Sequence, residues 1–122
     1  MDEHELTFLQ KQSCNSEYGA SECLPPEEID ILLSKLKGWE IVTENNLCKL
    51  RCTFCCRTFS ASMSLANAVA AISDDQNHHP SMIVEWGKVT VTWWTRELSG
   101  LHLNDFIMAA KCSLIAATNA QQ

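Results

Sequence analysis

The stretch from Cys48 to Arg57 reads CKLRCTFCCR, and its polarity alternates from one residue to the next. One set of alternate positions carries small or apolar side chains: Cys48, Leu50, Cys52, Phe54 and Cys56. Because successive side chains of a β-strand point to opposite faces of the sheet, this period of two predicts an antiparallel strand. One face of that strand should lie on a core and the other on water. We therefore expect a sheet that is covered on one side only.

A short helix and a short strand are expected before this stretch. Pro25–Glu28 is typical of a helix start, since proline suits the first turn and carboxylates suit the positive end of the helix dipole. Gly38 is expected to end the helix, Trp39–Val42 to form the strand, and Glu44–Asn46 to form a turn. The apolar stripe of the helix consists of Ile29, Leu32, Leu33 and Leu36.

A second helix, a hairpin and a third helix are expected after it. Ser60 or Ser62 can cap a helix that runs to about Ser73. Met82–Trp86 and Lys88–Thr95 should then form a hairpin, with Gly87 and Lys88 in the central places of a two-residue turn. Asn104 and Asp105 fall in the first turn of the third helix. The order α-β-β-α-β-β-α predicts an α+β fold, with a four-stranded antiparallel sheet and three helices packed on one face.

The composition of the chain limits the classes of function that can be expected of it. The chain has 122 residues, a net charge of −6 and 46% hydrophobic residues, as expected of a single globular domain. We expect residues 1–22, which are polar and aperiodic, to form a flexible tail, and residues 23–122 to form the domain. An acidic chain with scattered Lys and Arg lacks the basic face that nucleic acids or anionic membranes require, so neither is expected as a partner.

The seven cysteines are expected to be reduced, because the number is odd and the sequence starts with acidic residues rather than a signal peptide. No apolar run approaches the roughly 20 residues of a membrane helix, so a cytoplasmic location is expected. Cys52 and Cys55 form a CxxC pair, yet the period of two places them on opposite faces of the strand. Core packing is therefore favoured over zinc binding, and no metal site is predicted.

The segment Asp74–Pro80 carries the clearest candidate chemistry, since His78 and His79 are adjacent and precede a proline. Adjacent side chains diverge, so the pair is poorly suited to one metal ion. The histidines could serve a structural role at the sheet edge, or they could exchange protons, because imidazole changes its charge near neutral pH. Periodicity does not decide between these alternatives. His102 is expected at the surface, and Trp94 could form a wall for a flat heterocycle.

Taken together, these residues resemble the pterin-4a-carbinolamine dehydratase family, which in animals is also known as the dimerisation cofactor of a homeodomain transcription factor. The resemblance runs from about Pro25 to Lys111. Its motifs are Gly38-Trp39, then Asp74-x-x-x-His78-His79-Pro80 and Trp86, then the segment Trp94–Leu101, and finally Asn104-Asp105-Phe106.

The resemblance implies an enzyme that dehydrates 4a-hydroxytetrahydrobiopterin to quinonoid dihydropterin and water, and so recycles tetrahydrobiopterin. It implies that His78 and His79 are the acid–base pair, that pterin is the substrate, and that no metal or redox cofactor takes part. It also implies a homodimer or homotetramer. The residues that would bind the substrate are Asp74, Asn77, Pro80, Trp94, Thr95, Arg96 and Glu97.

One position departs from the family pattern. The family usually has Thr-His where this chain has Thr95-Arg96. Arginine stays protonated at any working pH, so Arg96 cannot replace the missing histidine as a base, although it can donate hydrogen bonds. We therefore expect a dehydratase whose efficiency is reduced. The alternative is a binding or assembly partner, similar to a transcriptional coactivator, that keeps the fold with little or no catalysis.

Overall fold

The computed structural model of the chain describes residues 9–11, 14, 24–98 and 100–119. Its elements are α2 (Pro26–Ser34), β1 (Glu40–Glu44), β2 (Leu47–Cys55), α3 (Phe59–Gln76), β3 (Ser81–Glu85), β4 (Lys88–Trp93), a 3₁₀ turn η1 (Arg96–Leu98) and α4 (Leu103–Asn119). The predicted order and the α+β class are confirmed. None of the helices in the described ranges is long and apolar enough to cross a membrane.

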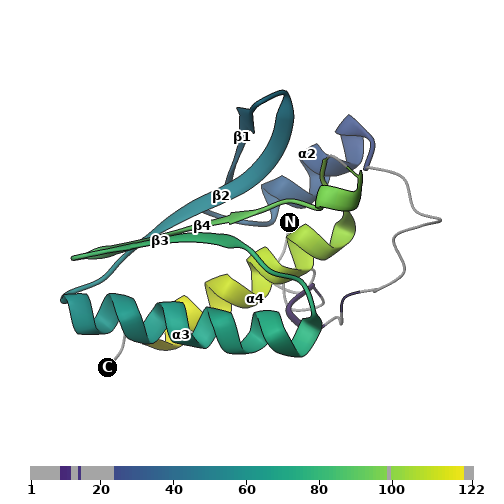
Figure 1. Cartoon of the computed structure of the whole chain (residues 1–122). Helices are drawn as coiled ribbons and strands as arrows, with labels where there is room; N and C mark the ends of the chain where they lie inside the picture. Colours follow the sequence, from purple (N-terminus) through teal and green to yellow (C-terminus); the bar gives the residue numbers. More distant parts are fainter. Residues whose placement is uncertain (1–8, 12–13, 15–23, 99, 120–122) are drawn as a thin grey trace.

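The four strands form one antiparallel sheet in the order β1-β2-β4-β3. The two long helices, α3 and α4, lie along the same face of this sheet (Figure 1). Leu50, Val89, Val91 and Trp93 point towards the helices and have no exposed surface. They pack against Phe106, Ile107 and Met108 of α4, while α2 contributes partly buried leucines at the margin of the same core.

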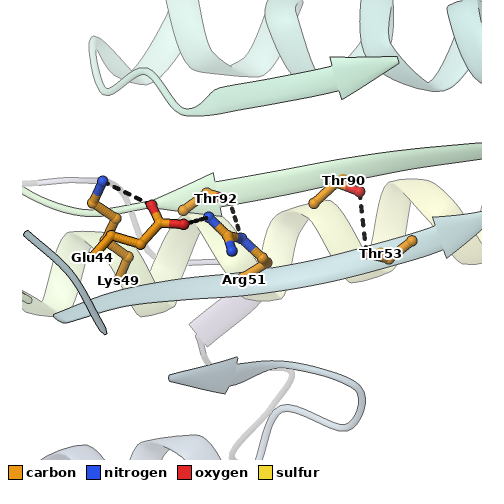
Figure 2. Close-up of polar contacts among 6 residues, drawn as sticks. All are labelled: Glu44, Lys49, Arg51, Thr53, Thr90 and Thr92. Carbon is orange, nitrogen blue, oxygen red and sulfur yellow. Dashed lines mark hydrogen bonds and ion pairs between the residues drawn. The ribbon is translucent and has the colours of Figure 1, made fainter. Parts of the chain in front are cut away.

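The other face of the sheet carries a polar ladder, as the alternation of CKLRCTFCCR predicts (Figure 2). Glu44 on β1 accepts hydrogen bonds from Lys49 (3.2 Å) and Arg51 (2.8 Å) on β2. Arg51 also donates to Thr92 on β4, at 2.9 Å. These contacts, with that to Arg51 the largest, hold the pKa of Glu44 below its usual value. Side chains thus connect three strands across the uncovered face.

Several element boundaries differ from the prediction. Helix α3 begins earlier than Ser60, because Thr58 is the N-cap and its Oγ1 accepts the amide hydrogen of Ala61 at 3.0 Å. The helix also continues to Gln76, so Asp74 lies in its last turn rather than in a loop. Helix α2 ends at Ser34, four residues before Gly38. Gly38 nevertheless has a φ of +90°, which glycine adopts without steric cost.

The β3–β4 hairpin also differs in detail. Glu85 pairs with Lys88, so the central turn residues are Trp86 and Gly87, not Gly87 and Lys88. Gly87 has a φ of +82° in the second central place, where type II turns require a positive φ. Near the chain start, the described residues include Leu9, which is buried in the core. Gln10, Lys11 and Cys14 are also described, and the other residues of the predicted flexible tail lie outside the described residues.

Candidate active site

The end of α3 presents the paired histidines to two different environments. Asn77 follows the helix with a φ of +53°, and its amide donates back to the carbonyls of Ser73 and Asp74. This left-handed residue ends the helix and turns the chain sharply towards β3. His78 then enters the interior, with 6% of its surface exposed, whereas His79 stays exposed.

His78 is held by a carboxylate from the other long helix. Its Nε2 lies 2.6 Å from Oδ1 of Asp105, a residue in the first turn of α4 with no exposed surface. An ionised carboxylate only accepts hydrogen bonds, so Nε2 of His78 carries the hydrogen that is donated to Asp105. The ring also stacks on Trp93, with 5.5 Å between centroids and 14° between planes. Both contacts fix the orientation of the imidazole.

The second carboxylate oxygen of Asp105 also accepts hydrogen bonds. Oδ2 accepts a hydrogen bond from the Thr95 hydroxyl at 2.8 Å and another from the backbone amide of His102 at 2.9 Å. Thr95 is fully buried two residues after β4, so one carboxylate joins the segment that follows β4, the loop before α4 and the residues that follow α3. Hydrogen bonds from these donors replace the hydration that the carboxylate loses on burial.

His102 is buried rather than exposed, which corrects the expectation that it lies at the surface. Its Nδ1 accepts the backbone amide hydrogen of Asn104 at 3.0 Å, so the imidazole acts as the helix cap that a serine or threonine more often provides. Burial, partly offset by the charge of Asp105 and reinforced by that of His78, lowers the pKa of His102. The side chain is therefore kept neutral beside the Asp105 carboxylate.

His79 and Asp74 form a separate pair at the surface. His79 Nε2 lies 3.0 Å from Asp74 Oδ1, and the two side chains are 51% and 81% exposed. An ion pair this exposed contributes little to stability. It does orient the His79 imidazole, and the surrounding water gives that ring a ready source of protons. The adjacent Asn77 is exposed and Pro80 is half-buried.

Trp94, the predicted aromatic wall, contacts two cationic side chains of the same chain. Lys49 Nζ lies 4.0 Å and Arg96 Cζ 4.7 Å from the centroid of the Trp94 ring. Cations over an indole face interact favourably with its quadrupole. Trp94 also follows Trp93 in the strand alternation, which directs it to the uncovered face of the sheet. Arg96 and Glu97 are exposed in η1, while Thr95 alone of this segment enters the Asp105 network.

Within the described part of the chain, no group of three or more His, Cys, Asp or Glu residues could hold a metal ion. Cys52 is buried and Cys55 is exposed, in agreement with the alternation argument against a CxxC site. Burial raises the pKa of Cys52 to about 11 and that of Cys112 to about 12, so both stay protonated thiols.

Two residues of this centre were not predicted from the sequence. Asp105 was placed in the first turn of the third helix, and His102 directly before it, but neither was assigned to the site. Carboxylates are common at the start of a helix because they interact favourably with the helix dipole, so Asp105 did not indicate a functional site. His78 and Asp105 are also 27 positions apart in the sequence, so no local pattern indicates their contact.

A four-stranded sheet backed by two long helices defines a small α+β protein, and a buried histidine–carboxylate pair lies at one end of it. The family model for pterin 4 alpha carbinolamine dehydratase matches residues 22–115. The chain therefore belongs to the pterin-4a-carbinolamine dehydratase family.

Relatives agree with this assignment. A protein of Chlorobium limicola, named "Putative pterin-4-alpha-carbinolamine dehydratase", is 42% identical over 106 residues, which are 87% of this chain and 94% of the relative. A Microcystis aeruginosa protein of the same name is 37% identical over 106 residues, 87% of this chain and 91% of its own. The crystal structure of a transcriptional coactivator/pterin dehydratase from Brucella melitensis superposes with a TM-score of 0.71 at 25% identity, and covers 78% of this chain and 99% of that one.

Proposed function

We propose that the protein dehydrates 4a-hydroxytetrahydrobiopterin to quinonoid dihydropterin, using His78 and His79 as the acid–base pair. The observation that carries this proposal is the 2.6 Å contact between His78 Nε2 and the fully buried Asp105. It holds the ring of His78 rigidly, we assign Nδ1 as the base, and the carboxylate stabilises the imidazolium that forms when the base accepts a proton.

The reaction breaks the C4a–O bond and forms a double bond between C4a and N5, so one proton leaves N5 and one joins the departing hydroxyl. We assign the first transfer to Nδ1 of His78, which has the fixed orientation that a base needs. We assign the second to His79, whose exposed ring can be reprotonated from water. The two protons balance, and water is the only by-product, so the step needs no redox cofactor. The pterin is the substrate, and its oxidation level is unchanged.

The ring would be bound by the segments that flank this pair. Asp74, Asn77 and Pro80 lie on the α3–β3 side, and Thr95, Arg96 and Glu97 lie beyond the end of β4. Stacking of a pterin on Trp94 would require the Lys49 or Arg96 side chain to move from the indole. Arg96 can donate hydrogen bonds but cannot accept a proton, which supports the proposal of a dehydratase slower than relatives with a third histidine.

The test is the rate at which purified protein accelerates carbinolamine dehydration over buffer. His78→Gln should lower kcat by about 10²- to 10⁴-fold, the usual contribution of one acid–base group, with a folded spectrum by circular dichroism. His79→Gln should lower it as well. Trp86→Phe, on the exposed hairpin turn, is the matched control and should leave kcat unchanged. No acceleration by the unmodified protein would refute the proposal.

The second candidate function is a binding or assembly partner with little catalysis. The similar Brucella melitensis protein is described as both a transcriptional coactivator and a pterin dehydratase, which favours keeping this candidate. His79→Ala distinguishes the two functions, because an assembly role would survive the loss of turnover.

We also propose a homodimer or homotetramer in the cytoplasm. Both β1 and β3 are edge strands, and Ile83 on β3 is 57% exposed, so a second copy would protect backbone groups and apolar surface. Light scattering that gave a monomer would refute this assembly. The six described cysteines are all free thiols, in keeping with a reducing compartment.

A further inference from the structure

A cavity of about 430 Å³ lies at the opposite end of α3 from the histidines. It is bounded by the end of β2, the first turns of α3 and the last turns of α4, which meet at one side of the molecule (Figure 1). The lining residues are Lys37, Phe54, Cys55, Cys56, Arg57, Ala61, Leu65, Ser113, Ala116 and Ala117. From Ala61 to Gln76 the helix rises about 22 Å, so this cavity is separate from the candidate active site.

The interior of the cavity is apolar and its rim is cationic. Phe54, Leu65 and the alanines of α4 supply the apolar wall, and no carboxylate of the described residues lines the cavity. Lys37 and Arg57 are both exposed at the rim. Within the described residues neither cation has an ion-pair partner, whereas Lys49 and Arg51 on the uncovered sheet face share Glu44.

Two further features favour an anion at this rim. The Ser113 hydroxyl accepts the indole hydrogen of Trp39 at 2.8 Å, and its own hydrogen has no acceptor in the described part of the chain. A hydroxyl can donate while it accepts, so this hydrogen is available to a ligand. The N-terminus of α3 also lies here, with no acidic residue in its first turn to offset the positive end of its dipole.

We propose that this cavity binds a small amphipathic carboxylate, with the apolar body against Phe54 and Leu65 and the carboxylate between Lys37 and Arg57. The volume lies within the roughly 300–1,000 Å³ of small-molecule sites. An uncharged apolar ligand would leave both cations unpaired, and a fully polar anion would leave the wall exposed to water. The site is independent of the proposed dehydratase reaction.

The chain provides its own internal control for a binding experiment. Cys56 lines the cavity, is half-buried and packs against the core as Phe54 does, whereas Cys48 is exposed and lies outside the lining, at the far end of β2. We would treat the full-length protein with iodoacetamide, with and without octanoate, and follow each thiol by mass spectrometry. Octanoate should slow the labelling of Cys56 in a saturable manner and leave the labelling of Cys48 unchanged. The protection of Cys56 should weaken as salt is added.

Variants separate a specific site from adsorption. Lys37→Gln with Arg57→Gln should weaken octanoate protection roughly threefold to thirtyfold, the range for two exposed charge pairs. Ala117→Phe, at an exposed position on the rim, should block the cavity and abolish protection. Lys49→Gln removes one positive charge elsewhere and should bind octanoate as the unmodified protein does. Equal protection of Cys48, no protection of Cys56, or undiminished protection in the double variant would overturn the proposal.

Discussion

Asp105→Asn isolates the contact that orients His78. An asparagine has nearly the shape of aspartate, and its single oxygen can still accept hydrogen bonds from Thr95 and from the backbone amide of His102. Its amide group then faces Nε2 of His78, where the carboxylate oxygen stood at 2.6 Å. Two N–H donors would oppose each other unless the imidazole gives up the hydrogen on Nε2.

The loss of stability in each variant of Asp105 follows from the number of hydrogen bonds that the substitution removes. The substitution removes one hydrogen bond to a charged group, worth about 1.5–3 kcal/mol, from a domain whose total stability is of the order of 5–15 kcal/mol. Asp105→Asn should therefore fold. Asp105→Ala leaves three buried donors without an acceptor, at about 1–3 kcal/mol each, so it should be close to unfolding. The proton on Nδ1 of His78 in the asparagine variant would also remove the base, and kcat should fall by about 10²- to 10⁴-fold.

The measurements are urea unfolding and the rate of carbinolamine dehydration on the same preparations. Thr95→Val and Thr95→Ser form the control pair, because the first loses one hydroxyl of the network and the second keeps it. Thr95→Ser should retain most of the activity and Thr95→Val should lose part of it. If Asp105→Asn matches the unmodified protein in both stability and kcat, the carboxylate does not orient His78 and the reasoning fails.

Three other predictions concern stability. Folding lowers the pKa of His102 below its usual value of 6.5. Just below pH 6.5 the unfolded chain therefore binds a proton at this histidine that the folded chain does not bind. The free energy of unfolding should decrease as the pH falls through this range. His102→Asn keeps a cap acceptor, and its urea midpoint should change less between pH 7.5 and 5.5 than that of the unmodified protein; an identical change would contradict the lowered pKa. The thiols of Cys52 and Cys112 have raised pKa values, so above pH 9 the unfolded chain loses protons that the folded chain keeps, and unfolding midpoints should decrease. Cys112→Ala should reduce that decrease. Asn77→Ala should cost about 1–2 kcal/mol because of its φ of +53°, while Asn77→Gly should cost much less; equal losses would show that the left-handed turn is not the cause.

Local patterns predicted the sheet well. The alternation through Leu50 and Cys52 assigned the buried face of β2 correctly, because a strand's side chains report burial at every second residue. Val89, Val91 and Trp93 followed the same rule on β4. Element ends were less predictable, since Thr58, Ser60 and Ser62 can all cap a helix and only the tertiary packing selects one.

The candidate site was predictable only where its residues are close in sequence. His78, His79 and Asp74 form one motif, and the structure keeps them together at the end of α3. Asp105 and His102 complete the centre through contacts made by folding, and no period in the sequence encodes the approach of α4 to that loop. The motif also did not predict that His79 is exposed while His78 is buried, because this difference depends on the turn at Asn77.

The parallel stacking of His78 on Trp93 gives the protein a built-in optical reporter. Indole emission responds to a neighbouring charge and shifts to shorter wavelength in apolar surroundings. Trp93 has no exposed surface, whereas Trp86 is 73% exposed, so their emission should differ in colour. Trp39 is also buried, so in a background with Trp39→Phe and Trp86→Phe a change in the blue emission would report on the charge of His78 beside Trp93. Proton transfer at the candidate base could then be observed by stopped-flow fluorescence, without a labelled substrate.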